Sequence, residues 1–561
     1  MKRKSVKAIM AGVLTLTMVC AATGCGDRNE TNNPTDVSGS SGSSAGGQES
    51  GSASGTSPES SATPEPTAQP EDRTPMNITV ALPSNETHTE NNQWYDRLVK
   101  EINEYTDMNV TWMWQEQATY YDDEHLGLWL STGNVPDVMI VGNNPTLINA
   151  AENGLFWDLS DYLKDYDNLA TISEVALASA SYNGKMYGIP RHRTIARNGI
   201  GYRVDWLNNL GLKEPTTLEA FSDMLYAFTY NDPDGNGADD TVGLGLDAWG
   251  GVWRIMETWF GVPNTWGIDD NGDLVYYAMT DEYKKALAQF REWYSQGVIN
   301  NGANGIPDFM DVKSGKARDE LLRTQLAGTY VQVLDDARKV ETYFEEQGLS
   351  TDEENIFTLQ AAVDTGLGTL CYPTTGMNNM IAISTKNIKT EEQLRRVLLF
   401  LNEMCDGAVK VLIEYGWEGL TYSLNDRGYV ELFDNDQLTA SGVGSTKYRD
   451  GFNQVIAYWT AEANAGTVTK ESGTSTITRL EQKLYAENVE YCVPNYGAGY
   501  TSDTYVEQGT ALDTILSDSL IAYIKGEIDD AGLEQALKQW WSAGGEAVTK
   551  EMNIMYHAAG N

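Results

Sequence analysis

Short apolar runs alternate with stretches of helical periodicity from residue 76 onward. Three β-rich runs, at 77–82, 109–114 and 137–141, come early in this part of the chain, and a helical stretch at 94–105 separates the first two. Strands that alternate with helices in this way favour a mainly parallel sheet with helices on both faces. The pattern therefore predicts an α/β fold.

The clearest later helices carry apolar residues three or four positions apart. One begins at Thr216 and Glu219, which have the spacing of a capping box, and another ends before Gly297. An Asp-Asn-Gly-Asp run at 270–273 predicts a hairpin turn between two β-rich runs. The apolar faces are Leu218, Phe221, Leu225 and Phe228, and then Tyr283, Leu287, Phe290 and Tyr294.

Composition and charge limit the classes of function. The part expected to fold, about 485 residues, is too long for one hydrophobic core and predicts two lobes. The net charge of -41 argues against nucleic-acid binding and against broad contact with anionic lipid, because both need clustered Lys and Arg. The chain has only 4 histidines, none in HExxH spacing, which argues against zinc-dependent hydrolysis.

The first residues have the three parts of a secretory signal. A basic start is followed by an apolar run at 8–22, which is shorter than the roughly 20 residues of a membrane span. The residues Ala22-Thr23-Gly24-Cys25 resemble a bacterial lipobox, although Ala22 stands where that pattern prefers Leu. An ordinary signal peptide with a chance cysteine is the alternative. The resemblance implies a signal peptide at 1–24 and a diacylglycerol group on Cys25, whose two acyl chains would hold the protein to a bilayer.

Residues 25–75 predict a tether. They are mostly Ser, Gly, Asn, Thr, Pro, Glu and Ala, a composition that cannot bury enough surface to offset the entropy of ordering. Such a flexible segment reaches roughly 40 Å on average. We therefore expect a folded domain that the lipid alone attaches to the extracellular face of the cell membrane, as in a Gram-positive bacterium. Three later cysteines, Cys371, Cys405 and Cys492, are an odd set without close spacing, which favours buried thiols over a disulfide framework or a metal site.

Seven short blocks, taken in order, resemble bacterial extracellular solute-binding protein family 1, the oligosaccharide-capturing subunits of ABC importers. The resemblance implies a two-lobed periplasmic-binding-protein-like fold of type II, with a cleft and a hinge between the lobes. It also implies a monomeric receptor that delivers its ligand to the transmembrane permease subunits. By analogy, lobe 1 would be 76–190 with 376–425, and lobe 2 would be 191–375 with 426–561. The blocks are Ser131–Asp137, Asn183–Pro190, Tyr202–Trp206, Pro215–Leu218, Ser314–Ala317, Tyr415–Gly419 and Gly544–Glu546.

The segment 247–254 is the densest candidate for sugar contacts. Aromatic rings cover the flat C–H faces of sugars, and planar polar side chains bond pairs of hydroxyls. The segment follows a β-like run at 242–246, and loops at the carboxyl ends of strands bind ligands in open α/β sheets. In the family, the matching loop supplies an acidic residue and a stacking aromatic, which implies Asp247 and Trp249. Trp253 is a further candidate, unless both tryptophans form one packed helix face.

Other candidates follow from their places in the chain. Asn143 and Asn144 follow a predicted strand and could contact a ligand or simply form a turn. Arg191 and Arg193 come at the point where, in the family, the chain crosses between the lobes. An acidic sugar becomes an attractive candidate ligand if both side chains face the cleft. The remaining candidates that the resemblance implies are Tyr330 and Trp417.

Residues 232–240 match the first nine positions of a calcium loop. Side-chain oxygens stand at positions 1, 3 and 5, Gly at 6, a carbonyl at 7 and Asp at 9. Gly243 occupies position 12, where an EF-hand has a bidentate Glu, so the last ligand would come from elsewhere. A calcium-free turn is the alternative. Some alginate-binding members of the family hold calcium at a similar loop, which implies a structural Ca²⁺. The predicted ligands are Asp232, Asp234, Asn236, Ala238 through its carbonyl, and Asp240.

A surface polysaccharide-degrading enzyme is the competing class of protein. The chain has 80 acidic residues, so carboxylate pairs at the hydrolase separation of about 5 to 9 Å will arise by chance. No Walker A motif or His-based catalytic pattern occurs. A carbohydrate sensor or adhesin that kept the binding fold is a third possibility. The sequence favours a non-enzymatic receptor that captures an oligosaccharide.

Overall fold

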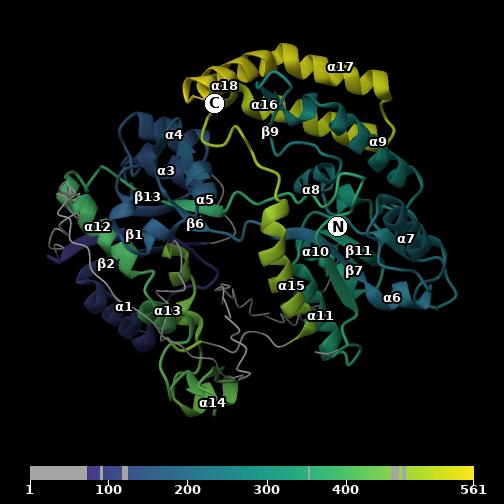
Figure 1. Cartoon of the computed structure of the whole chain (residues 1–561). Helices are drawn as coiled ribbons and strands as arrows, with labels where there is room; N and C mark the ends of the chain where they lie inside the picture. Colours follow the sequence, from purple (N-terminus) through teal and green to yellow (C-terminus); the bar gives the residue numbers. More distant parts are fainter. Residues whose placement is uncertain are drawn as a thin grey trace, which may run out of the picture.

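The protein was analysed as a computed structural model, in which two α/β bodies lie side by side (Figure 1). The predicted signal peptide, Cys25 and the tether up to residue 72 lie outside the described residues. Within the described part, no helix is long and apolar enough to cross a membrane. The structure describes residues 73–560, apart from 89–91, 117–119, 121–123, 352–353, 457–466 and 470–474.

The first body, called the first lobe, is built on a five-stranded sheet in the order β2-β1-β3-β13-β6. β1 runs parallel to both β2 and β3, as the alternating pattern predicts. β13 comes from much later in the chain and pairs antiparallel with β3 and β6, so the sheet is mixed. The strands are β1 (Met76–Ser84), β2 (Met108–Glu116), β3 (Val138–Val141), β6 (Ile189–His192) and β13 (Met377–Ile383).

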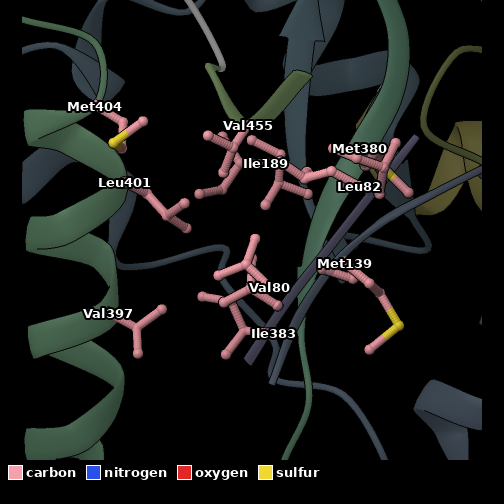
Figure 2. Close-up of a cluster of buried hydrophobic side chains, with 14 of the residues drawn as sticks. Val80, Leu82, Met139, Ile189, Met380, Ile383, Val397, Leu401, Met404 and Val455 are labelled. Atoms are coloured by element: carbon pink, nitrogen blue, oxygen red, sulfur yellow. The ribbon is translucent and has the colours of Figure 1, made fainter. Parts of the chain in front are cut away.

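Helices cover both sides of the first sheet (Figure 1). Asn92 caps the first of them by accepting the backbone N–H groups of Trp94 and Tyr95. Val80 and Ile383 are fully buried in the core and face Val397 and Leu401 of α12 (Figure 2). The helices of the first lobe are α1 (Gln93–Thr106), α3 (Glu124–Thr132), α4 (Pro145–Glu152), α5 (Glu174–Ala180), α12 (Glu391–Glu403), α13 (Gly407–Glu414) and α14 (Asn435–Ala440), the last of which lies apart from the sheet (Figure 1).

The first lobe extends further along the chain than the resemblance implied. Leu438, Phe452 and Val455 belong to the same buried cluster as β1 and α12. Their apolar side chains complete the first core. The prediction that 426–561 belongs to lobe 2 is therefore wrong for the stretch from α14 to Val455.

The second body, called the second lobe, has a four-stranded sheet in the order β12-β7-β11-β8. β11 runs parallel to β8 and antiparallel to β7, and β7 is also antiparallel to β12. The sheet depends on a glycine, because a Cβ on Gly201 would lie 2.1 Å from the ring of Tyr330 on the neighbouring strand. The strands are β7 (Asn198–Arg203), β8 (Val242–Leu244), β11 (Ala327–Val333) and β12 (Phe357–Gln360).

The second lobe carries more helices, and the C-terminal ones lie across it (Figure 1). Thr217 caps α7 by accepting the N–H of Ala220, one residue after the predicted cap. The predicted hairpin forms between β9 (Trp266–Ile268) and β10 (Leu274–Tyr276). The helices are α6 (Val204–Asn209), α7 (Leu218–Tyr230), α8 (Gly251–Trp259), α9 (Asp281–Ser295), α10 (Gly315–Arg323), α11 (Asp336–Glu346), α15 (Thr476–Glu487), α16 (Asp503–Ile524), α17 (Asp530–Trp540) and α18 (Glu546–Ala558).

Two segments that lie side by side, 193–198 and 372–376, cross between the lobes and join them. The N–H of Thr374 donates to the carbonyl of Ile195 at 2.8 Å, and the N–H of Arg193 donates to that of Gly376 at 2.9 Å. His192, at the end of β6, pairs with Met377 at the start of β13, whereas Asn198, at the start of β7, pairs with Val333 at the end of β11. The carboxyl ends of the parallel strands in both sheets therefore adjoin this hinge.

Candidate functional site

The loop after β8 presents one indole at the carboxyl end of a strand. The side chain of Trp249 is 48% exposed, and its ring lies against Gly251, where an added Cβ would be only 2.1 Å away. Asp247 accepts the backbone N–H of Trp249 through Oδ1 at 3.0 Å, which closes a local turn. The loop thus holds a large ring at the edge where α/β sheets bind ligands.

Asp247 itself faces inward. It is 2% exposed, and its Oδ2 lies 3.5 Å from the guanidinium of Arg318, which also bonds Asp319 at 2.7 Å and Asp336. Burial raises the pKa of Asp247, and the Arg318 charge opposes that rise. The structure corrects the predicted direct contact with a ligand, because the carboxylate has almost no exposed surface. Asp247 instead fastens the Trp249 loop to α10 and α11.

Trp253 and Tyr330 lie in the core of the second lobe. Trp253 is 2% exposed, and its ring centroid is 5.4 Å from those of both Phe290 and Phe309. Tyr330 is fully buried, where its hydroxyl accepts the N–H of Ala337 at 2.9 Å at the start of α11. The predicted ligand contacts are wrong for both residues, since neither has a surface to offer. For Trp253, the packed helix face is the correct interpretation.

The first-lobe asparagines stand at the carboxyl end of β3. Asn143 is exposed, and its Nδ2 donates to the carbonyl of Ser179 at 2.9 Å. Asn144 caps α4, because its Oδ1 accepts the N–H of Leu147 at 2.9 Å. Asn144 therefore has the structural role of a turn residue, whereas Asn143 has an exposed side chain at the carboxyl end of β3.

Arg191 and Arg193 are half-buried at the end of β6 and the start of the hinge. Arg191 donates to Oε1 of Gln454 at 2.8 Å and to the carbonyl of Asn378, so it joins β6 to the end of the first-lobe core. Arg193 bonds the second crossing segment through its backbone. Both residues lie where the chain crosses between the lobes, at the carboxyl end of β6.

Trp417 packs against α1 of the first lobe. Its Nε1 donates to Oε2 of Glu101 at 2.8 Å, and the guanidinium of Arg97 lies 4.2 Å from its ring centroid. The ring centroids of Trp94, at the start of α1, and of Tyr448 lie 5.8 Å and 6.0 Å away. Trp417 is half-buried among these residues, and its contact with a ligand stays a prediction.

An aromatic group that the sequence analysis missed lies where β1 and β2 end. It consists of His88, Tyr95, Trp114 and Phe452, and we call it the first-lobe aromatic cluster. His88 and Trp114 have ring centroids 4.1 Å apart, and Trp114 donates its indole N–H to the hydroxyl of Tyr95 at 2.9 Å. Burial lowers the pKa of His88, against the raising effect of Asp450. Trp112 and Trp114, two residues apart in β2, lie on the same face of the strand. This spacing in the sequence could have indicated the cluster.

The predicted calcium loop has a tightly turned backbone. Asp232, Gly235 and Gly237 have positive φ angles of 47°, 71° and 84°, and Oδ2 of Asp232 accepts the N–H of Gly237 at 3.0 Å. Nδ2 of Asn236 stands between two carboxylates, 2.9 Å from Oδ2 of Asp234 and 3.2 Å from Oδ1 of Asp240. An amide donor here partly offsets the repulsion between the two acids.

The donor set of this loop fits a hard cation. It offers only oxygen ligands, which Ca²⁺ prefers, and Oδ1 of Asp232 is buried without a hydrogen-bond partner. In the arrangement shown, however, no group of three or more His, Cys, Asp and Glu side chains among the described residues converges closely enough to hold a metal ion. Binding would require the Asn236 amide to turn its oxygen inward.

Known proteins with a similar sequence identify the family. Residues 97–317 match the model of the bacterial extracellular solute-binding proteins. Over 469 residues the chain is 31% identical to Lipoprotein LipO of Bacillus subtilis, covering 82% of this chain and 89% of LipO. The chain belongs to the bacterial extracellular solute-binding protein family. This solute-binding protein is also 27% identical over 468 residues to the polygalacturonan/rhamnogalacturonan-binding protein YtcQ of the same organism, covering 83% of this chain and 89% of YtcQ.

Solved structures show the same fold. An HMO-binding, ABC-transporter-associated solute-binding protein of Bifidobacterium longum infantis superposes with a TM-score of 0.63 at 17% identity, over 86% of this chain and 99% of that one. The two-lobed α/β fold is thus confirmed, and the class of extracellular solute-binding protein follows from the family. Two further structures share this fold. They are alginate-binding protein AlgQ2 without calcium ion (TM-score 0.59, 18% identity) and an EF-hand mutant of FusA from Streptococcus pneumoniae in complex with fructo-nystose (TM-score 0.60, 16% identity).

Proposed function

We propose that this solute-binding protein captures an oligosaccharide between its lobes and delivers it to the transmembrane subunits of an ABC permease. The observation that carries the proposal is the half-exposed Trp249 ring at the carboxyl edge of the second sheet. The first-lobe aromatic cluster stands at the matching edge of the first sheet, and both edges adjoin the hinge. Sugar rings bind by their C–H faces to such side chains.

Closure of the two lobes is the expected mechanism. A ligand that contacts Trp249 on one lobe and the first-lobe aromatic cluster on the other makes all its contacts only when the lobes are together. Differential affinity of this kind shifts the population toward the closed form. The crossing segments 193–198 and 372–376 would absorb the motion, and the permease would recognise the closed protein. A single chain has both edges, so a monomer suffices.

Acidic oligosaccharides are the first ligand class to test. YtcQ, named for polygalacturonan and rhamnogalacturonan, is a full-length relative, and Arg191 and Arg193 lie at the hinge end of the first sheet. FusA, by its name a fructooligosaccharide-binding relative, is 24% identical over 229 residues, so neutral fructans form the comparison set. Asn143 would add a hydroxyl contact from the first lobe.

A glycan panel read by tryptophan fluorescence tests this function. We expect intensity changes with pectin-derived oligomers, and intact ligand recovered by mass spectrometry after release. Shortened saccharides in the released fraction would overturn the receptor proposal. Trp249→Ala should raise the Kd, whereas Trp541→Phe, at a partly exposed tryptophan at the end of α17, should leave affinity unchanged.

The lipid anchor at Cys25 is part of the proposal, with LipO as a relative named for its lipid. The membrane would then be contacted through acyl chains alone, and the tether would keep the domain near its permease. We expect the protein to enter the detergent phase on Triton X-114 partition and to take up labelled palmitate. Cys25→Ser should abolish both, and unchanged partition would contradict lipidation.

We also propose a structural Ca²⁺ at residues 232–240, supported by the oxygen donor set and the unpartnered Oδ1 of Asp232. Binding to the folded state alone stabilises it by about 2.7 kcal/mol at a hundredfold excess over Kd. Calcium should therefore raise the thermal midpoint, and chelation should reverse the rise. Asp232→Ala should abolish it, while Asp426→Asn, which removes a charge from the turn at 425–428, where Arg427 breaks the alternation of oxygen ligands, should not. Equal responses in both variants would refute the site.

A further inference from the structure

Two thiols of the second lobe face each other across a short backbone pairing. Cys371 and Cys492 form a parallel β-bridge, in which the N–H of Cys371 donates to the carbonyl of Tyr491 at 2.9 Å and that of Val493 donates to Cys371 at 3.0 Å. Both are free thiols, with Cys371 buried and Cys492 partly exposed. The remaining described thiol, Cys405, lies in the core of the first lobe.

The backbone pairing places these thiols within reach of a disulfide. Paired strands lie about 4.8 Å apart, and a disulfide needs Cα atoms separated by roughly 4.4 to 6.8 Å with Cβ atoms about 3.5 to 4.5 Å apart. Side chains directly opposed in a parallel bridge lie on the same side of it. The bridge is an isolated pair and not part of a longer ladder, so only one pairing has to adjust for the Cβ atoms to approach.

A pocket gives small molecules access to this pair. It has a volume of about 460 Å³ and is lined by residues that include Leu370, Cys492 and the half-exposed ring of Tyr496. Cys492 lines this pocket and is partly exposed, whereas Cys371 is buried and is not among the lining residues. This order matches the two roles in thiol–disulfide exchange, where an exposed thiol reacts first and a neighbouring one resolves the mixed disulfide.

We propose that Cys371 and Cys492 form a disulfide when the exported protein meets a small-molecule disulfide oxidant. The Cys492 thiolate attacks the oxidant, forms a mixed disulfide and expels one thiol. Cys371 then attacks Sγ of Cys492, forms the protein disulfide and expels the second thiol. The two cysteines lose two protons and two electrons, and the oxidant gains them as two thiols.

The bond would fasten one side of the hinge. Cys371 immediately precedes the crossing segment 372–376, and Cys492 lies in the connection from α15 to α16. That connection also touches the first lobe, where the N–H of Asn183 donates to the carbonyl of Gly499 at 3.1 Å. Burial raises the pKa of Cys371 to about 12 and that of Cys492 to about 11. Thiolates are the reacting species, so the exchange should accelerate with rising pH.

The test uses the full exported chain, purified in detergent without reductant and incubated with oxidised glutathione in mildly alkaline buffer. We expect non-reducing peptide mapping to find a single linked pair that contains Cys371 and Cys492, with Cys405 still free. In C371S, Cys492 should keep glutathione as a mixed disulfide. In the matched control C405S, the linked pair should form at the rate of the unaltered chain.

The decisive measurement is on the unaltered chain, so it does not depend on how the variants fold. Glutathione retained on Cys492 without a linked peptide would overturn the proposal, as would a linked pair that contains Cys405 or three unreacted thiols. The oxidised chain should also show a higher thermal midpoint than the reduced chain. That difference should be absent in C371S, and its persistence there would assign the gain to another cause.

Discussion

Trp249 and Trp253 stand four residues apart in one segment, and their replacement by alanine should have opposite consequences. Trp249→Ala should weaken carbohydrate binding and leave stability nearly unchanged. Trp253→Ala should lower stability and leave affinity nearly unchanged in the molecules that fold. The contrast follows from exposure, which is 48% for Trp249 and 2% for Trp253.

The magnitudes follow from the areas involved. A tryptophan offers roughly 200 Å² of side-chain surface, so the exposed half of Trp249 leaves about 100 Å² for a ligand to cover. At about 25 cal/mol per Å² this is an upper limit near 2.5 kcal/mol. Sugar faces are partly polar, so about 1.4 kcal/mol is expected, which is a tenfold rise in Kd. Trp253→Ala should instead reduce the free energy of unfolding by about 3 to 5 kcal/mol.

Both quantities can be measured on the same three proteins by urea unfolding and by calorimetric titration with the oligosaccharide found in the glycan panel. Gly251→Ala adds an independent check, because its Cβ would displace the indole of Trp249 without removing it. That variant should lose affinity and keep most of its stability. A stability loss from Trp249→Ala as large as that from Trp253→Ala would refute the reasoning, as would unchanged affinity in both Trp249→Ala and Gly251→Ala.

Three further predictions concern buried polar groups. Burial raises the pKa of Glu403 from its ordinary value near 4.5 to about 7, so the folded chain keeps a proton that the unfolded chain releases. The free energy of unfolding should therefore fall as pH rises between these values, and Glu403→Gln should flatten the decline in urea titrations; an equally steep decline in that variant would contradict it. Arg254→Met leaves the fully buried Glu257 without its cation and should reduce the free energy of unfolding by about 3 to 5 kcal/mol. The double variant with Glu257→Met should recover much of this loss, as measured by denaturant midpoints. A double variant no more stable than the single one would argue against the ion pair. Tyr330→Phe leaves the backbone N–H at the start of α11 without its acceptor and should reduce the free energy of unfolding by about 1 to 3 kcal/mol. Ligand affinity should not change. A loss of affinity would show that Tyr330 contributes to the binding site.

Local sequence pattern was sufficient for the parallel part of the first sheet. The runs at 77–82, 109–114 and 137–141 form β1, β2 and β3, because each run is short, rich in β-branched or aromatic residues and separated from the next by a helix. β13 could not be placed in this way. It joins β3 from far along the chain and in the antiparallel direction, and no local pattern encodes a distant partner.

The candidate site was harder to predict, because burial decides it. Trp249 and Trp253 have the same chemistry, and the start of α8 at Gly251 separates them: one precedes the helix and the other packs inside it. Asp247 follows a strand, as a ligand-binding acid would, yet Arg318 turns it inward from a distant helix. Such pairings depend on tertiary structure, which a pattern of residue types does not contain.

The two sheets need very different lengths of chain. The second has all its strands once residues 198–360 are present, although its core takes apolar side chains from as far as Tyr556. The first needs strands from 76 to 383 and apolar side chains as far as Ile456. A chain exported from its N-terminus would therefore deliver the first-lobe strands earliest but finish the second sheet first. Long-range pairing is slow to form, so β1, β2 and β3 must wait outside the cell with uncovered apolar faces. That interval makes them the segment most dependent on extracellular folding factors and most open to proteases during secretion.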